Sequence, residues 1–100
     1  MDVQDFCKQM EEQLVTFEQQ LGVIENELDS RGTAGKEKIL PVVGDVKNLM
    51  TELKLQKDRL EKECPSEWSD DKNKMEDLVG SIGSNIDRAK GQLSQGDVGG

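Results

Sequence analysis

Histidine is absent from this 100-residue chain, and cysteine and aromatic residues are scarce. Without histidine, the chain lacks the usual general base, the partner of serine and cysteine nucleophiles, and the glutamate–histidine ligand sets of di-iron bundles. The two cysteines, Cys7 and Cys64, are too far apart in the sequence for a zinc-binding motif. We therefore predict that the protein is not an enzyme and has no metal or cofactor site.

Long apolar runs and basic clusters are missing too. The residues are 33% hydrophobic and 34% charged, with a net charge of −8. Residues 1–5 carry neither a basic region nor an apolar run, so the sequence predicts no signal peptide, no transmembrane span and a cytoplasmic protein. Nucleic acid is not an expected partner, because no segment is basic enough to neutralise phosphates. No motif indicates a small-molecule substrate.

Glycines and carboxylates occur in clusters that need an interpretation. Three glycines interrupt the last helical pattern: Gly80, Gly83 and Gly91. No lysine follows them as in a phosphate-binding loop, so we interpret them as close-packing or helix-weakening positions.

The carboxylate clusters fall mostly on exposed helical faces and are predicted to be solvated surface. Weak binding of a divalent cation by Glu67, Asp70 and Asp71 is the alternative.

The first helix is predicted at about residues 2–29. Its apolar residues recur at alternating steps of four and three, which is typical of a coiled-coil seam. The seam consists of Val3, Cys7, Met10, Leu14, Phe17, Leu21, Ile24 and Leu28. Glutamate and glutamine dominate the flanking columns, one of which also contains Phe6. The sequence thus predicts a helix with one narrow apolar face.

A second helix is predicted at about residues 36–63. Pro41 complicates its start, because proline fits only the first turn of a helix. The helix therefore begins between Gly35 and Leu40, or earlier with a kink at Pro41. Its predicted seam is Ile39, Val42, Val46, Leu49, Leu53, Gln56 and Leu60, with Val43 and Met50 widening one side. A wide apolar face predicts that this helix contacts two neighbours and forms the centre of a bundle.

The third helix is predicted at about residues 67–93. It follows a break at Cys64 and Pro65, with Ser66 as the expected N-cap. Its apolar stripe is Trp68, Lys72, Met75, Val79, Ile82, Ile86, Ala89 and Leu93. Residues 94–100 contain three glycines and no apolar pattern, so they are predicted to be a disordered tail.

The short breaks predict an all-α, elongated, antiparallel three-helix coiled-coil bundle spanning residues 1–93. Residues 1–30 have a net charge of −7 and residues 31–64 a net charge of +2, which favours packing of the first two helices side by side. Folding one helix onto the other pairs residues whose numbers sum to about 67. This alignment would place Glu27 near Lys38 and Glu11 near Lys57.

Trp68 and the two cysteines are the candidate functional residues. Trp68 is predicted to plug one end of the bundle, near Val3, Cys7 and Cys64; the alternative is an anchor for a partner protein. The alignment brings Cys7 within about a turn of Cys64. The two are expected to be separate apolar thiols, and a disulfide or thiol switch is the alternative.

The run from Cys64 to Lys72 resembles a pattern found in small bacterial coiled-coil proteins of uncharacterised function, some of which are labelled stress-response proteins. Trp68, Lys72 four residues later and Ala89 carry the resemblance, which extends over about residues 6–93. It implies a hairpin of two heptad helices followed by an amphipathic helix. It also implies an association with stress, and no known catalytic or binding residues.

Together these patterns predict a cytoplasmic structural or protein-interaction module that acts through a helical face or by self-association. The alternative is reversible binding of a membrane or lipid surface by opened amphipathic helices, which the net charge of −8 disfavours. Binding of a small ligand or metal between the helices is a third and weaker interpretation.

Overall fold

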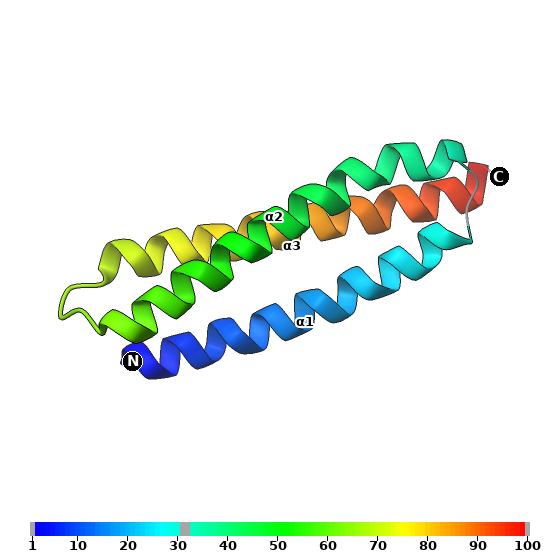
Figure 1. Cartoon of the computed structure of the whole chain (residues 1–100). Coiled ribbons are helices and arrows are strands. Elements are labelled where there is room, and N and C mark those ends of the chain that lie inside the picture. The colour runs from blue at the N-terminus through cyan, green and yellow to red at the C-terminus, as the bar shows by residue number, and fades with distance from the viewer. Residues whose placement is uncertain (1, 31–32, 100) are drawn as a thin grey trace.

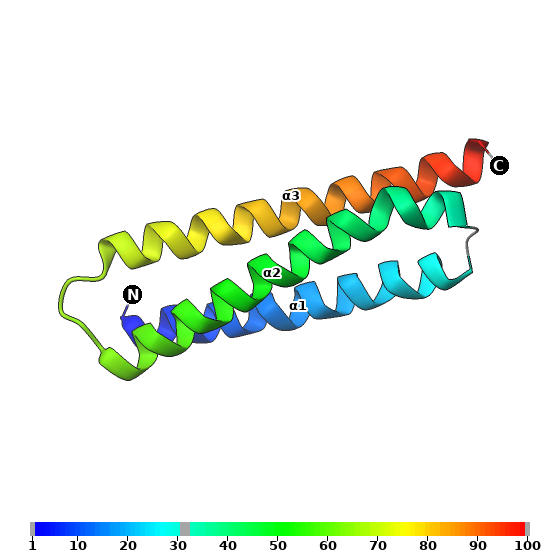
Figure 2. The ribbon, with the colours of Figure 1, turned by 45° about the horizontal axis from the view of Figure 1, so that its top comes forward.

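Three long helices form an elongated bundle in the computed structural model, which describes residues 2–30 and 33–99, without the side chains of 33–35 and 94–99. The helices are α1 (Val3–Asp29), α2 (Thr33–Glu63) and α3 (Ser69–Gly99). The chain reverses direction at each connection, so that α1 and α3 run opposite to α2 (Figure 1; Figure 2). The bundle measures 53 × 18 × 18 Å. The predicted all-α three-helix bundle is confirmed.

Helix α1 begins where the sequence predicts. The Asp2 side chain caps it by accepting a hydrogen bond of 2.8 Å from the Asp5 N–H, which satisfies one of the free donors of the first turn. Seven of the eight predicted seam residues are buried, and Val3 is half-buried. Phe6 is buried as well, although its column of the repeat is otherwise polar. The core face of α1 is therefore wider at its first turns than the sequence predicts.

In the buried row of α2, every second residue lies one position later in the sequence than predicted. The buried residues are Ile39, Val43, Val46, Met50, Leu53, Lys57 and Leu60. Val42, Leu49 and Gln56 were expected in the seam but are only half-buried. Both rows alternate steps of three and four, so spacing alone does not distinguish them. Packing against the other helices favours the observed row, which places Lys57 in the core.

Helix α2 starts before the predicted range of Gly35 to Leu40, and the kink predicted for such an early start stays a prediction. The helix begins at Thr33, and Pro41 lies inside it. Since proline has no N–H, the Glu37 carbonyl lacks its usual donor four residues later. Ile39 and Val43 on either side of the proline are buried with 3% and 5% of their surface exposed. Their burial favours the helix despite the missing hydrogen bond.

Both ends of α3 differ from the prediction. The Trp68 carbonyl accepts a bond of 2.9 Å from the Lys72 N–H, so Trp68 and not Ser66 occupies the N-cap position. Glu67 consequently precedes the helix. At the other end the backbone remains helical to Gly99, where a disordered tail was expected after about residue 93. A helix propagates at little cost per residue once it is nucleated, and no proline interrupts this stretch. Residue 100 lies outside the described residues.

Three glycines in the described part of α3 are not sites of close helix packing. A Cβ atom added at Gly80, Gly83 or Gly91 would meet no other atom within 4 Å. Of the two predicted roles, only helix weakening is consistent with this space. Each glycine costs a helix roughly 1 kcal/mol relative to alanine, so α3 depends on its apolar row for stability.

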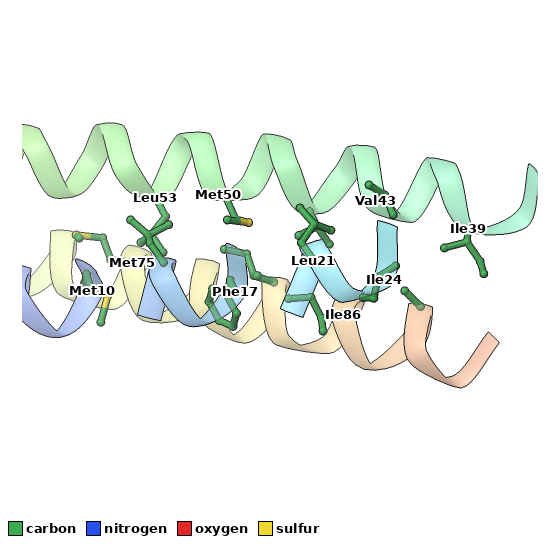
Figure 3. Packing of buried hydrophobic residues seen from close by; sticks show 14 of the residues in the cluster. Met10, Phe17, Leu21, Ile24, Ile39, Val43, Met50, Leu53, Met75 and Ile86 are labelled. Atoms are coloured by element: carbon green, nitrogen blue, oxygen red, sulfur yellow. The ribbon is translucent and has the colours of Figure 1, made fainter. Parts of the chain in front are cut away.

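Helix α2 is the centre of the bundle, as predicted from its wide apolar face. It contacts α3 most extensively and α1 next, whereas the contact between α1 and α3 is the smallest. Figure 3 shows Leu53 and Met50 of α2 pointing toward the other two helices. Leu53, Met75 and Ile82 are completely buried, so the core is continuous through the middle of the bundle.

Candidate functional site

The candidate residues gather at the end of the bundle where α1 begins and α2 ends. This end, which we call the Trp68 end, comprises Phe6, Cys7, Lys57, Cys64 and Trp68. The antiparallel arrangement of α1 and α2 brings Cys7 and Lys57 together, although they are 50 positions apart in the sequence. The structure thus brings together the predicted candidates and two residues, Phe6 and Lys57, that the prediction left outside the core.

Trp68 lies against Phe6 at the start of α3. The two ring centroids are 5.3 Å apart and the ring planes are tilted by 52°, an arrangement in the range that aromatic pairs prefer. Trp68 is half-buried and packs against the core. Phe6 is therefore the aromatic partner of Trp68 in the core. Both roles proposed for Trp68, as a plug of the bundle end and as an anchor for a partner, stay predictions.

Lys57 occupies a core position of α2 with only 7% of its surface exposed. Its ammonium group is surrounded by three carboxylates. Nζ lies 2.8 Å from Asp58 Oδ1, 3.8 Å from Glu11 Oε1 and 3.8 Å from Glu61 Oε2. The stem of the lysine is therefore in the core, while its charge is matched at the boundary with solvent.

The charges around Lys57 shift two pKa values in opposite directions. A hydrogen bond to Asp58 raises the pKa of Lys57 above its ordinary value, and this effect outweighs the opposing effect of burial. The same hydrogen bond lowers the pKa of Asp58. Both shifts favour the charged forms. The pair therefore stays ionised over a wider pH range than isolated side chains would.

The two cysteines have different surroundings. Cys7 is buried, and its Sγ lies 3.7 Å from the Lys57 carbonyl oxygen, to which it donates. Burial raises the pKa of this thiol, with Glu61 as the next contribution. Cys64 is exposed and its thiol donates to the Glu61 carbonyl at 3.1 Å. Both thiols are free in the structure, and a disulfide between them stays a prediction.

Cys64 also terminates α2 in a backbone conformation that is unusual for a residue with a side chain. Its φ of 43° lies in the left-handed region, where glycine commonly ends helices. The chain then turns through Pro65 toward α3. The sequence correctly predicted a break between the helices at this point. It did not predict the left-handed conformation, because the residue is not a glycine.

Ion pairs between α1 and α2 confirm one predicted contact and replace another. Glu11 lies near Lys57, as expected. Lys38 and Glu27 do not form an ion pair in the described part of the chain; Lys47 and Glu25 do, with Nζ 3.5 Å from Oε2. Both members of that pair are about half exposed, so the pair contributes at most about 1 kcal/mol.

A metal site is not formed by the residues that the structure describes. Within 2–30 and 33–99, no group of three or more histidine, cysteine, aspartate or glutamate residues could hold an ion. Of the acids proposed for a cation, Asp70 and Asp71 lie in the first turn of α3, whereas Glu67 lies before it.

No described helix has the length and apolar character needed to cross a bilayer.

Lys57 and Phe6 are the buried residues at this end that the sequence pattern did not place in the core. Phe6 falls in a polar column of the repeat, and Lys57 is charged. The available signal was the row Val43, Met50 and Lys57, spaced by seven residues, which runs beside the expected seam.

Comparisons of this chain with protein-family models, with curated proteins and with solved structures gave no match. The resemblance to small bacterial coiled-coil proteins therefore stays a prediction.

Proposed function

We propose that this protein is a non-enzymatic helical module that acts by contacting another protein or a second copy of itself in the cytoplasm. The observation that carries the proposal is the exposure of Leu55, which has 65% of its surface in solvent. It is one of four exposed large apolar residues: Val15, Val23, Leu40 and Leu55. An association with stress responses remains part of the proposal only through the resemblance.

The distribution of these four residues supports a contact through the α1–α2 hairpin. Single exposed apolar residues are common on protein surfaces. Here all four belong to α1 and α2, and no described side chain of α3 is a large apolar residue exposed to this degree. Burial of a leucine in a contact contributes about 1.5–3 kcal/mol. A partner on α1 and α2 would gain this energy, whereas one on α3 would not.

Site-specific photo-crosslinking tests the proposal. A photoreactive phenylalanine analogue replaces Leu55 in one variant and Val15 in another, each in the full chain expressed in cells of its source. Irradiation is expected to give a covalent adduct with one protein, and mass spectrometry of the adduct shows whether it is a second copy. The analogue at Asp87, which is exposed on α3, serves as the control.

A protein adduct at Leu55 or Val15 and none at Asp87 would support a contact through α1 and α2. Equal labelling of all three positions, or no labelling, would contradict it. Adducts with lipid would instead support the membrane-surface alternative. That alternative requires the helices to separate, because their apolar rows are buried in the bundle.

A further inference from the structure

An open groove runs along the surface of the bundle between α1 and α2. It has a volume of about 390 Å³, and the residues that line it belong to these two helices alone. Leu14 and Leu21 of α1 and Met50 of α2 form its floor. Met50 and Leu14, with 8% and 7% of their surface exposed, are the least buried apolar residues of the described core. The floor of the groove is therefore an edge of the apolar core.

The two walls of the groove carry charges of opposite sign. Glu18 lies on the α1 wall, and Lys47 and Lys54 lie on the α2 wall. Glu25 follows Glu18 by seven residues, and its Oε2 is 3.5 Å from Lys47 Nζ. Glu18 and Lys54 are exposed, and neither is in an ion pair with another described residue. The groove thus has an acidic wall and a basic wall.

Two glycines leave open space beside the groove. Gly22 lies between Glu18 and Glu25 on one face of α1, and Gly44 lies three residues before Lys47 on α2. A Cβ atom added at either glycine would meet no other atom within 4 Å. Packing within the chain therefore needs neither glycine, although each weakens its helix by roughly 1 kcal/mol relative to alanine. Glycines at these positions allow another helix to approach closely.

A second copy of the chain carries the charges that fit these walls. When two copies face each other across a twofold axis parallel to the bundle, α1 of each lies over α2 of the other and runs in the opposite direction. This rotation keeps every residue at its height along the bundle. Glu25 and Lys47, which are level within one copy, therefore meet across the axis as well. Glu18 and Lys54 are each seven residues away from them, in the directions that antiparallel helices bring to one level.

We propose that the chain forms a twofold-symmetric dimer through this groove, in which α1 and α2 of both copies make a four-helix core and each α3 lies outside. This dimer rests on the proposed function and names its partner as a second copy. Val15, three residues before Glu18, and Leu55, four residues after Thr51 of the groove, lie beside the contact. Both are exposed in the single chain, and their burial favours association.

The charges also define the limits of the contact. A twofold axis across the bundle would place acidic wall on acidic wall, and like charges repel each other. Toward the Trp68 end, Glu11 and Glu61 lie level on either side of Lys57. The parallel axis would bring these two acids together, so the contact is centred on the middle of the groove.

Sedimentation equilibrium tests the dimer in about 0.15 M salt, which screens charges more than about 8 Å apart. The unsubstituted chain is expected to show a reversible monomer–dimer equilibrium at concentrations up to about 500 μM. Glu18→Lys and Lys54→Glu each place like charges against one another, so each should raise the dissociation constant at least about tenfold. Both positions are exposed, so the helical circular dichroism should be retained.

An equal mixture of these two variants separates a contact between copies from an effect within one chain. In a mixed dimer the introduced lysine faces the introduced glutamate, and the unchanged Lys54 faces the unchanged Glu18. We expect the mixture to dimerise about as strongly as the unsubstituted chain, although neither variant does so alone.

Gly22→Gln blocks the contact without a change of charge. The added side chain has room in the single chain, so the urea midpoint of the monomer should be equal or higher. In the dimer the same side chain occupies the space of the second copy, so association should weaken. Gly80→Gln, at an exposed glycine of α3 with the same open space, is the matched control and should dimerise like the unsubstituted chain.

Three results would overturn the dimer: a chain that stays monomeric at the highest concentration, single variants that associate normally, or a mixture that does not recover association. The proposed function is decided separately, by whether photo-crosslinking at Leu55 or Val15 captures a protein.

Discussion

The middle of the bundle and the Trp68 end share one heptad spacing but differ in what fills their core. In the middle, Leu53, Met75 and Ile82 are apolar and completely buried. At the Trp68 end the core positions are taken by a cysteine and a lysine, next to the aromatic pair. The middle is therefore held by apolar burial. The Trp68 end adds an aromatic contact and the ion pairs of Lys57.

Leu53→Ala should have the largest effect and tests the role of the middle. Leu53 has no exposed surface, so its truncation removes buried carbons and leaves a cavity, at a cost of about 2–5 kcal/mol. Urea unfolding followed by circular dichroism measures this loss. Leu55→Ala, two residues along the same helix and 65% exposed, should change the free energy of unfolding by less than about 0.5 kcal/mol. Similar losses in both variants would contradict the proposed core.

A smaller effect is expected from separating the aromatic pair at the Trp68 end. Phe6→Leu and Trp68→Leu, alone and combined, form a double-mutant cycle measured by urea unfolding. Because the rings are 5.3 Å apart, the coupling energy should be about 0.5–1.5 kcal/mol. The same cycle with Phe17→Leu, a buried ring in another part of α1, should give a coupling near zero. Equal couplings would show that the pair has no special contact.

The smallest predicted effect is a loss of stability in alkaline solution, which we expect from Cys7 and Lys57 at the Trp68 end. Burial raises the pKa of Cys7 above its ordinary 9.0, and the bond to Asp58 raises the pKa of Lys57 above 10.5. In both cases the unfolded chain loses its proton first, so the free energy of unfolding falls as pH rises past the unfolded value. The fall begins with Cys7 and continues with Lys57.

Urea unfolding between about pH 7 and about pH 11 measures this fall. Cys7→Ala removes the thiol and should remove the part that begins near pH 9.0, the ordinary pKa of cysteine. The part due to Lys57 should persist in that variant. An identical pH profile with and without the thiol would show that Cys7 is not the group responsible.

The fold was predictable from the sequence because heptad spacing reports which residues share a face. The spacing located all three helices, their antiparallel order and nearly the whole buried row of α1. It was ambiguous in α2, where two rows one residue apart have the same spacing. The burial of Lys57 in place of Gln56 depends on contacts with two neighbouring helices, which spacing along one helix does not contain.

The candidate site was only partly predictable. Trp68 and Cys7 stood out by residue type, and the ion pair of Glu11 with Lys57 followed from the antiparallel alignment. Phe6 did not stand out, because its burial depends on where Trp68 lies after the turn at Cys64. That turn rests on a left-handed cysteine, a conformation that residue type does not predict for cysteine.

We expect Pro41 to divide α2 into two parts that differ in amide hydrogen exchange. Because the Glu37 carbonyl has no amide donor at position 41, the hydrogen-bond ladder of α2 is interrupted there. Opening of the turns before the proline breaks few bonds of the remaining helix, so their amide protons exchange through local fluctuations. Amides around Leu53 lie beneath a fully buried side chain and exchange only when the bundle unfolds. We therefore expect one helix to contain two parts of different local stability, divided at Pro41.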